Sequence, residues 1–171
     1  MMRGVYYLKI LLLYLYLSLN GPTVQGVALS KVNDVAKKLL MAKSLPFEDC
    51  GSKYLILYLN ISSCTTIPCL MRRGTTVDVN VLFDDDSDNT KYLKHRVRWI
   101  FNTIKTQAHI TPDPCDGNQK CLSNDNDGKF YWATVLVNKT LPAISGTMLW
   151  EAVNEYNQDV ICFKVPVVIT M

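Results

Sequence analysis

Six cysteines, all beyond residue 49, constrain this chain of 171 residues more than any other feature. They form two closely spaced sets, CTTIPC and CDGNQKC, with one cysteine before them and one after: Cys50, Cys64, Cys69, Cys115, Cys121 and Cys162. In an oxidising compartment an even number of cysteines indicates three disulfides, whereas a zinc site would need reduced thiolates. Each short spacing can close a small ring and leave the outer cysteines to join the domain ends, but sequence alone leaves the connectivity open.

The first residues indicate which compartment the chain enters. Arg3 and Lys9 precede an uncharged apolar stretch over residues 10–19, and Gly21 and Pro22 follow it. This order is typical of a secretory signal peptide, so we predict one over residues 1–26 and expect a secreted, extracellular protein, with the endolysosomal lumen as an alternative. The stretch is about half the roughly 20 residues that cross a bilayer as a helix, which disfavours a permanent anchor.

Two sequons agree with secretion and predict glycosylation at Asn60 and Asn138. Between the signal peptide and the first cysteine, residues 27–45 place apolar side chains at helical spacing opposite lysines. This N-terminal extension is therefore expected to be helical. We expect this extension to dock on the domain or to be trimmed away. The alternative is that it lies on a membrane surface.

From residue 54 onward the apolar residues follow a period of two and are rich in β-branched and aromatic types. We expect strands over residues 54–61, 75–83, 94–103, 130–137, 148–153 and 161–169. Regular turns and the lack of intervening helices predict an all-β fold, an immunoglobulin-like antiparallel β-sandwich of about seven strands in two sheets. A true immunoglobulin domain is disfavoured, because its inter-sheet cysteine pair would not leave two small cystine rings.

Charge and motifs exclude several classes of function. Lys and Arg total 18 against 15 Asp and Glu, and no basic stripe is present, so nucleic acid is not an expected partner. No nucleophile motif surrounds His95, expected in a strand, or His109, expected in a loop, and an enzyme is not indicated. Two acidic clusters resemble incomplete calcium loops and are interpreted as solvated turns: Asp84, Asp86 and Asp88, and Asn124, Asp125 and Asp127. No metal or cofactor is expected.

The interior of such a sandwich has two interpretations. Facing sheets can part to form an apolar cavity for a ligand, although composition alone favours a solid core. Five motifs favour the cavity over the solid core. In order along the chain they are PFEDCGS, NISSCTTIPC, RRGTTVDVNVLF, DPCDGNQKC and CFKVPVVI. Together they resemble the ML lipid-recognition family over residues 46–171, which we take as the domain.

The resemblance implies several properties. The three disulfides would join Cys50 to Cys162, Cys64 to Cys69, and Cys115 to Cys121. The protein would be a monomeric lipid carrier, and candidate partners are a sterol, a fatty acid or another small apolar lipid, together with a membrane surface or a membrane sterol-acceptor protein. Family positions that line the cavity match Trp150 and Phe163, and those at its entrance match Val137 and Leu141. The inward strand faces add three more, so the predicted ligand-binding residues are Val79, Val97, Phe101, Val137, Leu141, Trp150 and Phe163.

The resemblance is incomplete at the entrance. The sterol carriers place a Pro-Phe-Pro segment there, where this chain has Gln107-Ala108-His109, and Leu141 replaces an aromatic residue. Arg73 and Asp113 match charged surface positions of the sterol carriers, whereas a third position, basic in them, is Asp116. The alternative function is a protein that presents a lipid or glycolipid in innate immune recognition or chemical signalling.

Overall fold

The computed structural model describes residues 38–39, 41–85, 90–119, 121–125 and 128–171. The predicted signal peptide and most of the 27–45 extension lie outside these residues. At its described end, residues 38–39 and 41–43 are helical, and the helix expected over the rest stays a prediction. Within the described ranges no helix has the length and apolar character needed to cross a membrane.

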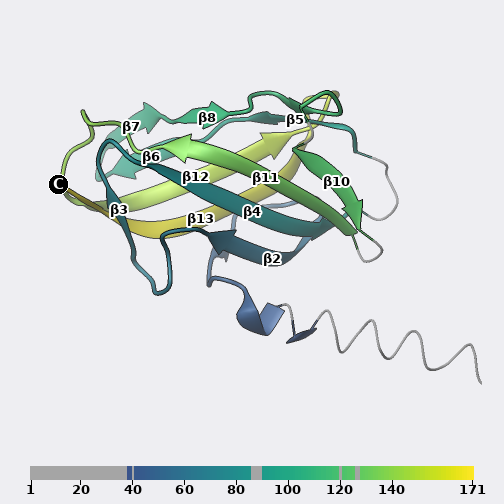
Figure 1. Ribbon diagram of the computed structural model, residues 1–171, viewed down its shortest axis with the longest axis horizontal. Helices are drawn as coiled ribbons and strands as arrows, with labels where there is room; N and C mark the ends of the chain where they lie inside the picture. The colour runs from purple at the N-terminus through teal and green to yellow at the C-terminus, as the bar shows by residue number, and fades with distance from the viewer. Residues whose placement is uncertain (1–37, 40, 86–89, 120, 126–127) are drawn as a thin grey trace, which may run out of the picture. The chain divides into compact units, whose positions relative to one another are not determined.

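The described part of the chain forms strands that are arranged in two layers (Figure 1). Their bounds are β1 Glu48–Asp49, β2 Leu55–Ile61, β3 Cys69–Arg72, β4 Thr76–Asp84, β5 Tyr92–His95, β6 Arg98–Phe101, β7 Ile104–Gln107, β8 His109–Thr111, β9 Cys115–Asp116, β10 Leu122–Asp125, β11 Gly128–Leu136, β12 Ser145–Val153 and β13 Asp159–Thr170. One sheet has the order β1-β13-β12-β5-β9, with β3 beside β13 and β6 and β7 continuing from β12. The other has the order β10-β11-β4-β2, with β8 beside β11.

This architecture is the expected all-β sandwich, with two differences in detail. The pairing of β3 with β13 is parallel, whereas the other strand pairs are antiparallel among the described residues. The strand expected over residues 94–103 is divided into β5 and β6, yet its register against β12 continues: His95 faces Ala152 and Arg98 faces Leu149. The alternation therefore persists through the break.

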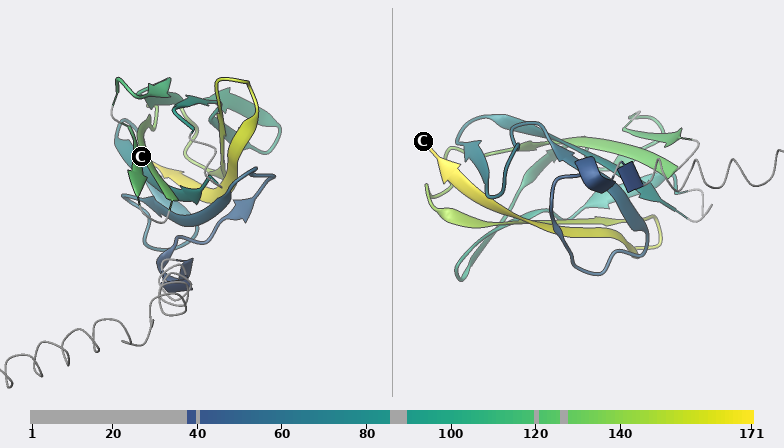
Figure 2. Two further views of the ribbon diagram at one scale, coloured as in Figure 1. Left: turned by 90° about the vertical axis from the view of Figure 1, so that its right-hand side faces the viewer. Right: turned by 90° about the horizontal axis from the view of Figure 1, so that it is seen from below.

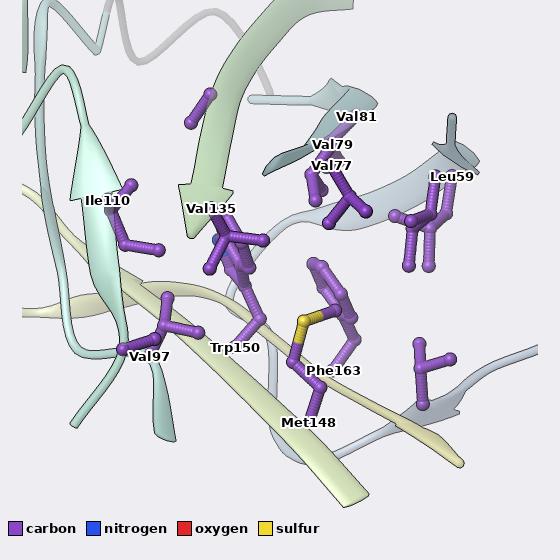
Figure 3. Close-up of a cluster of buried hydrophobic side chains, with 14 of the residues drawn as sticks. Leu59, Val77, Val79, Val81, Val97, Ile110, Val135, Met148, Trp150 and Phe163 are labelled. Carbon is purple, nitrogen blue, oxygen red and sulfur yellow. The ribbon is translucent and has the colours of Figure 1, made fainter. Parts of the chain in front are cut away.

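Period-two alternation brings the apolar faces of both sheets together. In β4 the side chains of Val77, Val79 and Val81 are buried while Asp78 is exposed. Figure 3 shows the β4 valines, with Val135 of β11, pointing toward Met148, Trp150 and Phe163 of the opposite sheet. Figure 2 gives the same two layers seen along and across the strands. The core lies between them, as apolar burial requires.

Three disulfides brace the sandwich with the pairing that the family resemblance implies. Cys50–Cys162 joins residues 112 positions apart, and Cys64–Cys69 and Cys115–Cys121 close short rings. The DCGS motif explains how the first of these is positioned. The Asp49 carboxylate accepts hydrogen bonds from the backbone N–H of Gly51 at 2.8 Å and of Ser52 at 3.0 Å, and the Ser52 hydroxyl donates to the Cys162 carbonyl at 3.0 Å.

Candidate functional site

The seven predicted ligand-binding residues come from both sheets and share one hydrophobic core. Val79 lies in β4, Phe101 in β6, Trp150 in β12 and Phe163 in β13. Val97 lies between β5 and β6, while Val137 and Leu141 follow β11. None is more than 5% exposed, and all belong to the same cluster of contacting side chains. The structure thus brings them together, and their binding of a ligand stays a prediction.

Trp150 is fully buried in this interior. Its ring stacks on Phe163 with centroids 5.8 Å apart and planes 6° from parallel, because the two residues are cross-strand partners in β12 and β13. In Figure 3 Val97 is drawn to the left of Trp150, and Val135 of β11 points toward it. These residues form an apolar surface suited to a flat or chain-like lipid.

A hollow of about 160 Å³ lies at the predicted entrance, beside Leu141. Gln107, Ala108 and His109 contribute to its lining, as expected for the segment that replaces the apolar one of the sterol carriers. His109 differs from the sequence expectation, because it begins β8 and pairs with Leu136 of β11 instead of lying in a loop. The hollow is smaller than the roughly 300–1,000 Å³ of typical ligand sites, so a whole lipid would need the interior side chains to move apart.

A second, larger hollow of about 330 Å³ is lined by residues of β12 and β13, of the segment around β1 and of the loop between β2 and β3, among them Phe47, Ile67, Thr147 and Pro166. Lys164 and Glu48 cross it as an ion pair, with Nζ and Oε1 2.6 Å apart. Lys164 and Pro166 alternate along β13 with the core residues Phe163, Val165 and Val167. This hollow therefore lies on the outer face of the sheet, where its lining residue Phe47 packs edge-on against Phe163 with ring centroids 6.1 Å apart.

His95 forms a polar link inside the interior that the sequence analysis missed. Its ring nitrogen Nδ1 lies 3.2 Å from Asp113 Oδ1, and Nε2 is hydrogen-bonded to the Tyr131 hydroxyl. The imidazole also contacts Trp150 edge-on, with centroids 5.6 Å apart. One pattern in the sequence could have revealed it. His95 lies two residues before Val97 and so falls on the same strand face as Val97, Trp99 and Phe101, which predicts an inward side chain. Asp113 lies at an exposed position, as expected, and its carboxylate is also tied to this histidine.

The protonation states of this link follow from burial. Loss of water lowers the pKa of His95, while the nearby Asp113 carboxylate opposes the shift. Burial likewise raises the pKa of Tyr131 well above its ordinary value, and the nearby Trp150 indole offsets part of that rise. Tyr131 therefore keeps its proton and donates to Nε2, and the neutral imidazole donates from Nδ1 to Asp113.

This link predicts a pH dependence of stability. Below about pH 6.5 an unfolded His95 takes up a proton that the folded one resists, so the free energy of unfolding falls as pH decreases from 7 to 5. His95→Gln removes that proton uptake, and its unfolding free energy should depend less steeply on pH in this range. Denaturant titrations of wild type, His95→Gln and the exposed-site control His109→Gln measure the slopes. Equal slopes for all three would contradict the assignment.

The predicted glycosylation sites and the two acidic clusters are the remaining candidates from the sequence. Asn138 is exposed, and its Oδ1 accepts hydrogen bonds from the backbone N–H and hydroxyl of Thr140, both at 3.0 Å, while Asn60 is half-buried on β2. Glycosylation of either stays a prediction. Asp86, Asp88 and Asp127 lie outside the described residues, and Asp85 pairs with Lys129 at 3.3 Å. No group of three or more potential metal ligands occurs among the residues the structure describes.

Fold and interior together define a disulfide-braced immunoglobulin-like sandwich with an aromatic apolar core. A family model of the ML domain matches residues 44–169. The chain belongs to the ML-domain family.

Known relatives agree with this membership. The chain is 30% identical over 133 residues to "NPC intracellular cholesterol transporter 2" of Mus musculus, covering 75% of this chain and 87% of the relative. It is 28% identical over 137 residues to "NPC intracellular cholesterol transporter 2 homolog a" of Drosophila melanogaster, covering 77% and 91%. The crystal structure of a Niemann-Pick type C2 protein from the Japanese carpenter ant superposes with a TM-score of 0.55 at 25% identity, covering 74% of this chain and all of that one.

Proposed function

We propose that this protein is a secreted, non-enzymatic lipid carrier that binds a sterol, fatty acid or similar apolar ligand between its two sheets and transfers it. The observation that carries the proposal is the convergence of both sheets on the stacked rings of Trp150 and Phe163, and a hollow lined by Leu141 at the predicted entrance supports it. The cholesterol-transporter names of the relatives support the ligand class.

The energetics of such binding need no covalent step. Enclosing ~300 Å² of apolar ligand surface at about 25 cal/mol per Å² contributes roughly 7 kcal/mol, which corresponds to a dissociation constant on the order of several micromolar before the costs of association weaken it. Opening the interior reduces this value, because side chains that now contact each other must separate.

A vesicle assay tests transfer. We expect the purified protein to bind a fluorescent sterol or a fluorescent fatty acid at one molecule per chain, and to accelerate its movement from donor to acceptor vesicles. Protein that has been reduced and alkylated is the control, because it lacks the disulfides that hold the sheets together. Failure to bind either probe would refute the carrier.

A lipid-presenting protein is the second candidate function. Exposed apolar side chains near the entrance favour it: Ile104 is 59% exposed and Ile144 is 43% exposed, each two residues from a residue lining the hollow. A presenter leaves part of its ligand accessible beside such a rim, whereas a carrier encloses it. Quenching of the bound fluorescent lipid by a water-soluble quencher separates the two: strong quenching indicates presentation and weak quenching indicates enclosure.

A further inference from the structure

The outward face of the sheet that contains β13 carries apolar side chains that are open to solvent. Along β13 the outward residues are Lys164, Pro166, Val168 and Thr170, which alternate with buried core residues. Val168 lies opposite Leu70 of β3, whose side chain is 62% exposed. The strand register therefore places Leu70, Val168 and Pro166 next to one another on the outer surface, and we call these three residues the β13 patch.

The hollow of about 330 Å³ lies beside this patch. Pro166 lines it together with Phe47 and Ile67, which come from the segment around β1 and from the loop before β3. Along this edge of the sheet β1 begins opposite Lys164, whereas β3 begins opposite Val167. The hollow therefore occupies the gap between the two short strands, next to the exposed side chain of Leu70.

Charged groups flank the patch at both ends of the same sheet edge. Arg72 of β3 is exposed and lies opposite Thr170, three positions after Val167. Glu48 of β1 lies opposite Lys164, three positions before Val167, and its side chain is 68% exposed. A cation and an anion are therefore placed symmetrically about Val167.

This symmetry makes the surface complementary to a second copy of itself. When two copies meet outer face to outer face, a two-fold axis that crosses the strands at Val167 places each strand over its counterpart in the opposite direction. Leu70 of each copy then faces the hollow of the other, which is larger than a leucine side chain. Arg72 of each copy faces Glu48 of the other. Apolar surface thus meets apolar surface, and each charge at the rim meets its opposite.

We infer that this protein forms a two-fold symmetric dimer through the β13 patch, with Leu70 of each copy inserted into the hollow of the other. The inference is independent of the proposed lipid carrier, and it differs from the monomer that the family resemblance implies.

The size of the patch predicts how tightly the copies associate. Seven residues of a strand extend about 23 Å and four adjacent strands about 19 Å, so the outer face offers on the order of 400 Å² per copy. Because stable interfaces bury about 800 Å² per partner, the dimer is weak, with a dissociation constant on the order of 10–100 μM.

Sedimentation equilibrium of the disulfide-bonded protein, from about 1 to about 500 μM, tests the inference. Wild type should pass from monomer to dimer over this range. Leu70→Lys inserts a charge into an apolar contact and should raise the dissociation constant at least about tenfold. The matched control is Leu55→Lys, which alters a side chain of β2 that is 58% exposed on the other sheet and should dimerise like wild type. Equal denaturant midpoints for the two variants show that both are folded.

Charge reversal tests the arrangement of the two copies. Arg72→Glu alone creates two Glu–Glu contacts across the axis, and Glu48→Arg alone creates two Arg–Arg contacts, so each variant should stay monomeric over this range. An equimolar mixture of the two should dimerise, because both contacts then join opposite charges. Lys91→Glu and Glu155→Arg make the same changes in net charge at exposed positions outside the patch, and each should dimerise like wild type.

Three results would overturn the dimer: a wild type that is monomeric throughout the range, a Leu70→Lys variant that dimerises like wild type, or a mixture of the two charge variants that stays monomeric. A monomeric wild type that binds neutral phosphatidylcholine vesicles, with that binding lost in Leu70→Lys, would overturn it in favour of a membrane surface. Failure to bind a fluorescent lipid is a separate result, because it refutes the carrier and leaves the dimer standing.

Discussion

Trp150→Ala is expected to abolish lipid retention and to lower the free energy of unfolding by about 3–5 kcal/mol, the usual cost of replacing a buried tryptophan with alanine. Trp150 is fully buried and contacts Phe163, His95 and Tyr131, so the substitution removes the central surface against which a ligand would pack. We expect at least a tenfold rise in the dissociation constant of a bound fatty acid or sterol, a change of about 1.4 kcal/mol or more. Chemical denaturation and ligand titration measure the two effects separately.

Two comparisons distinguish a carrier from a solid core. Trp132→Ala removes a tryptophan from the outward face of β11 and should leave lipid affinity unchanged. Trp150→Leu retains more of the packing and should lose affinity even if the alanine variant folds poorly. In a solid core the result would be reversed: wild type would bind no lipid, and the space opened by Trp150→Ala would create a new site. That outcome would contradict the carrier.

Removing the long disulfide should have the second large effect. The Cys50–Cys162 bond closes a loop of 112 residues, which the chain-entropy model values at ~4–5 kcal/mol. Because small domains are stable by only about 5–15 kcal/mol, the double variant Cys50→Ala/Cys162→Ala should unfold at a much lower denaturant concentration. Non-reducing denaturant titration monitored by tryptophan fluorescence measures this change.

The short ring Cys64–Cys69 provides the matched control. It spans five positions, so the double variant Cys64→Ala/Cys69→Ala should lose only about 2 kcal/mol. An equal loss for both variants would show that local packing, and not the length of the closed loop, sets the contribution of these bonds. The hydrogen bonds between Ser52 and Cys162 would still hold the two ends near each other in the long-loop variant.

The main strands were predictable because their apolar residues alternate over six or more positions. The β4 stretch shows this clearly, since Val77, Val79 and Val81 turn inward and Asp78 turns outward. Segments such as β1, β8 and β9 are two or three residues long, too short for alternation to be recognised. They exist because a neighbouring strand supplies hydrogen-bond partners, which is a tertiary effect that local sequence does not encode.

The apolar interior was predictable, but its polar groups were not. Alternation placed Trp99 and Phe101 on the inward face, and the family resemblance singled out Trp150 and Phe163. The link from His95 to Asp113 and Tyr131 joins three separate parts of the chain, and no local pattern pairs them.

Native mass spectrometry of the protein secreted by its own kind of cell tests the central claim most directly. The account predicts a complex whose mass exceeds that of the processed chain and its glycans by one lipid, which solvent extraction then releases for identification. Either a fatty acid or a sterol would support the carrier and would name its ligand class. A protein that leaves the cell empty and takes up neither oleate nor a sterol afterwards would contradict the account.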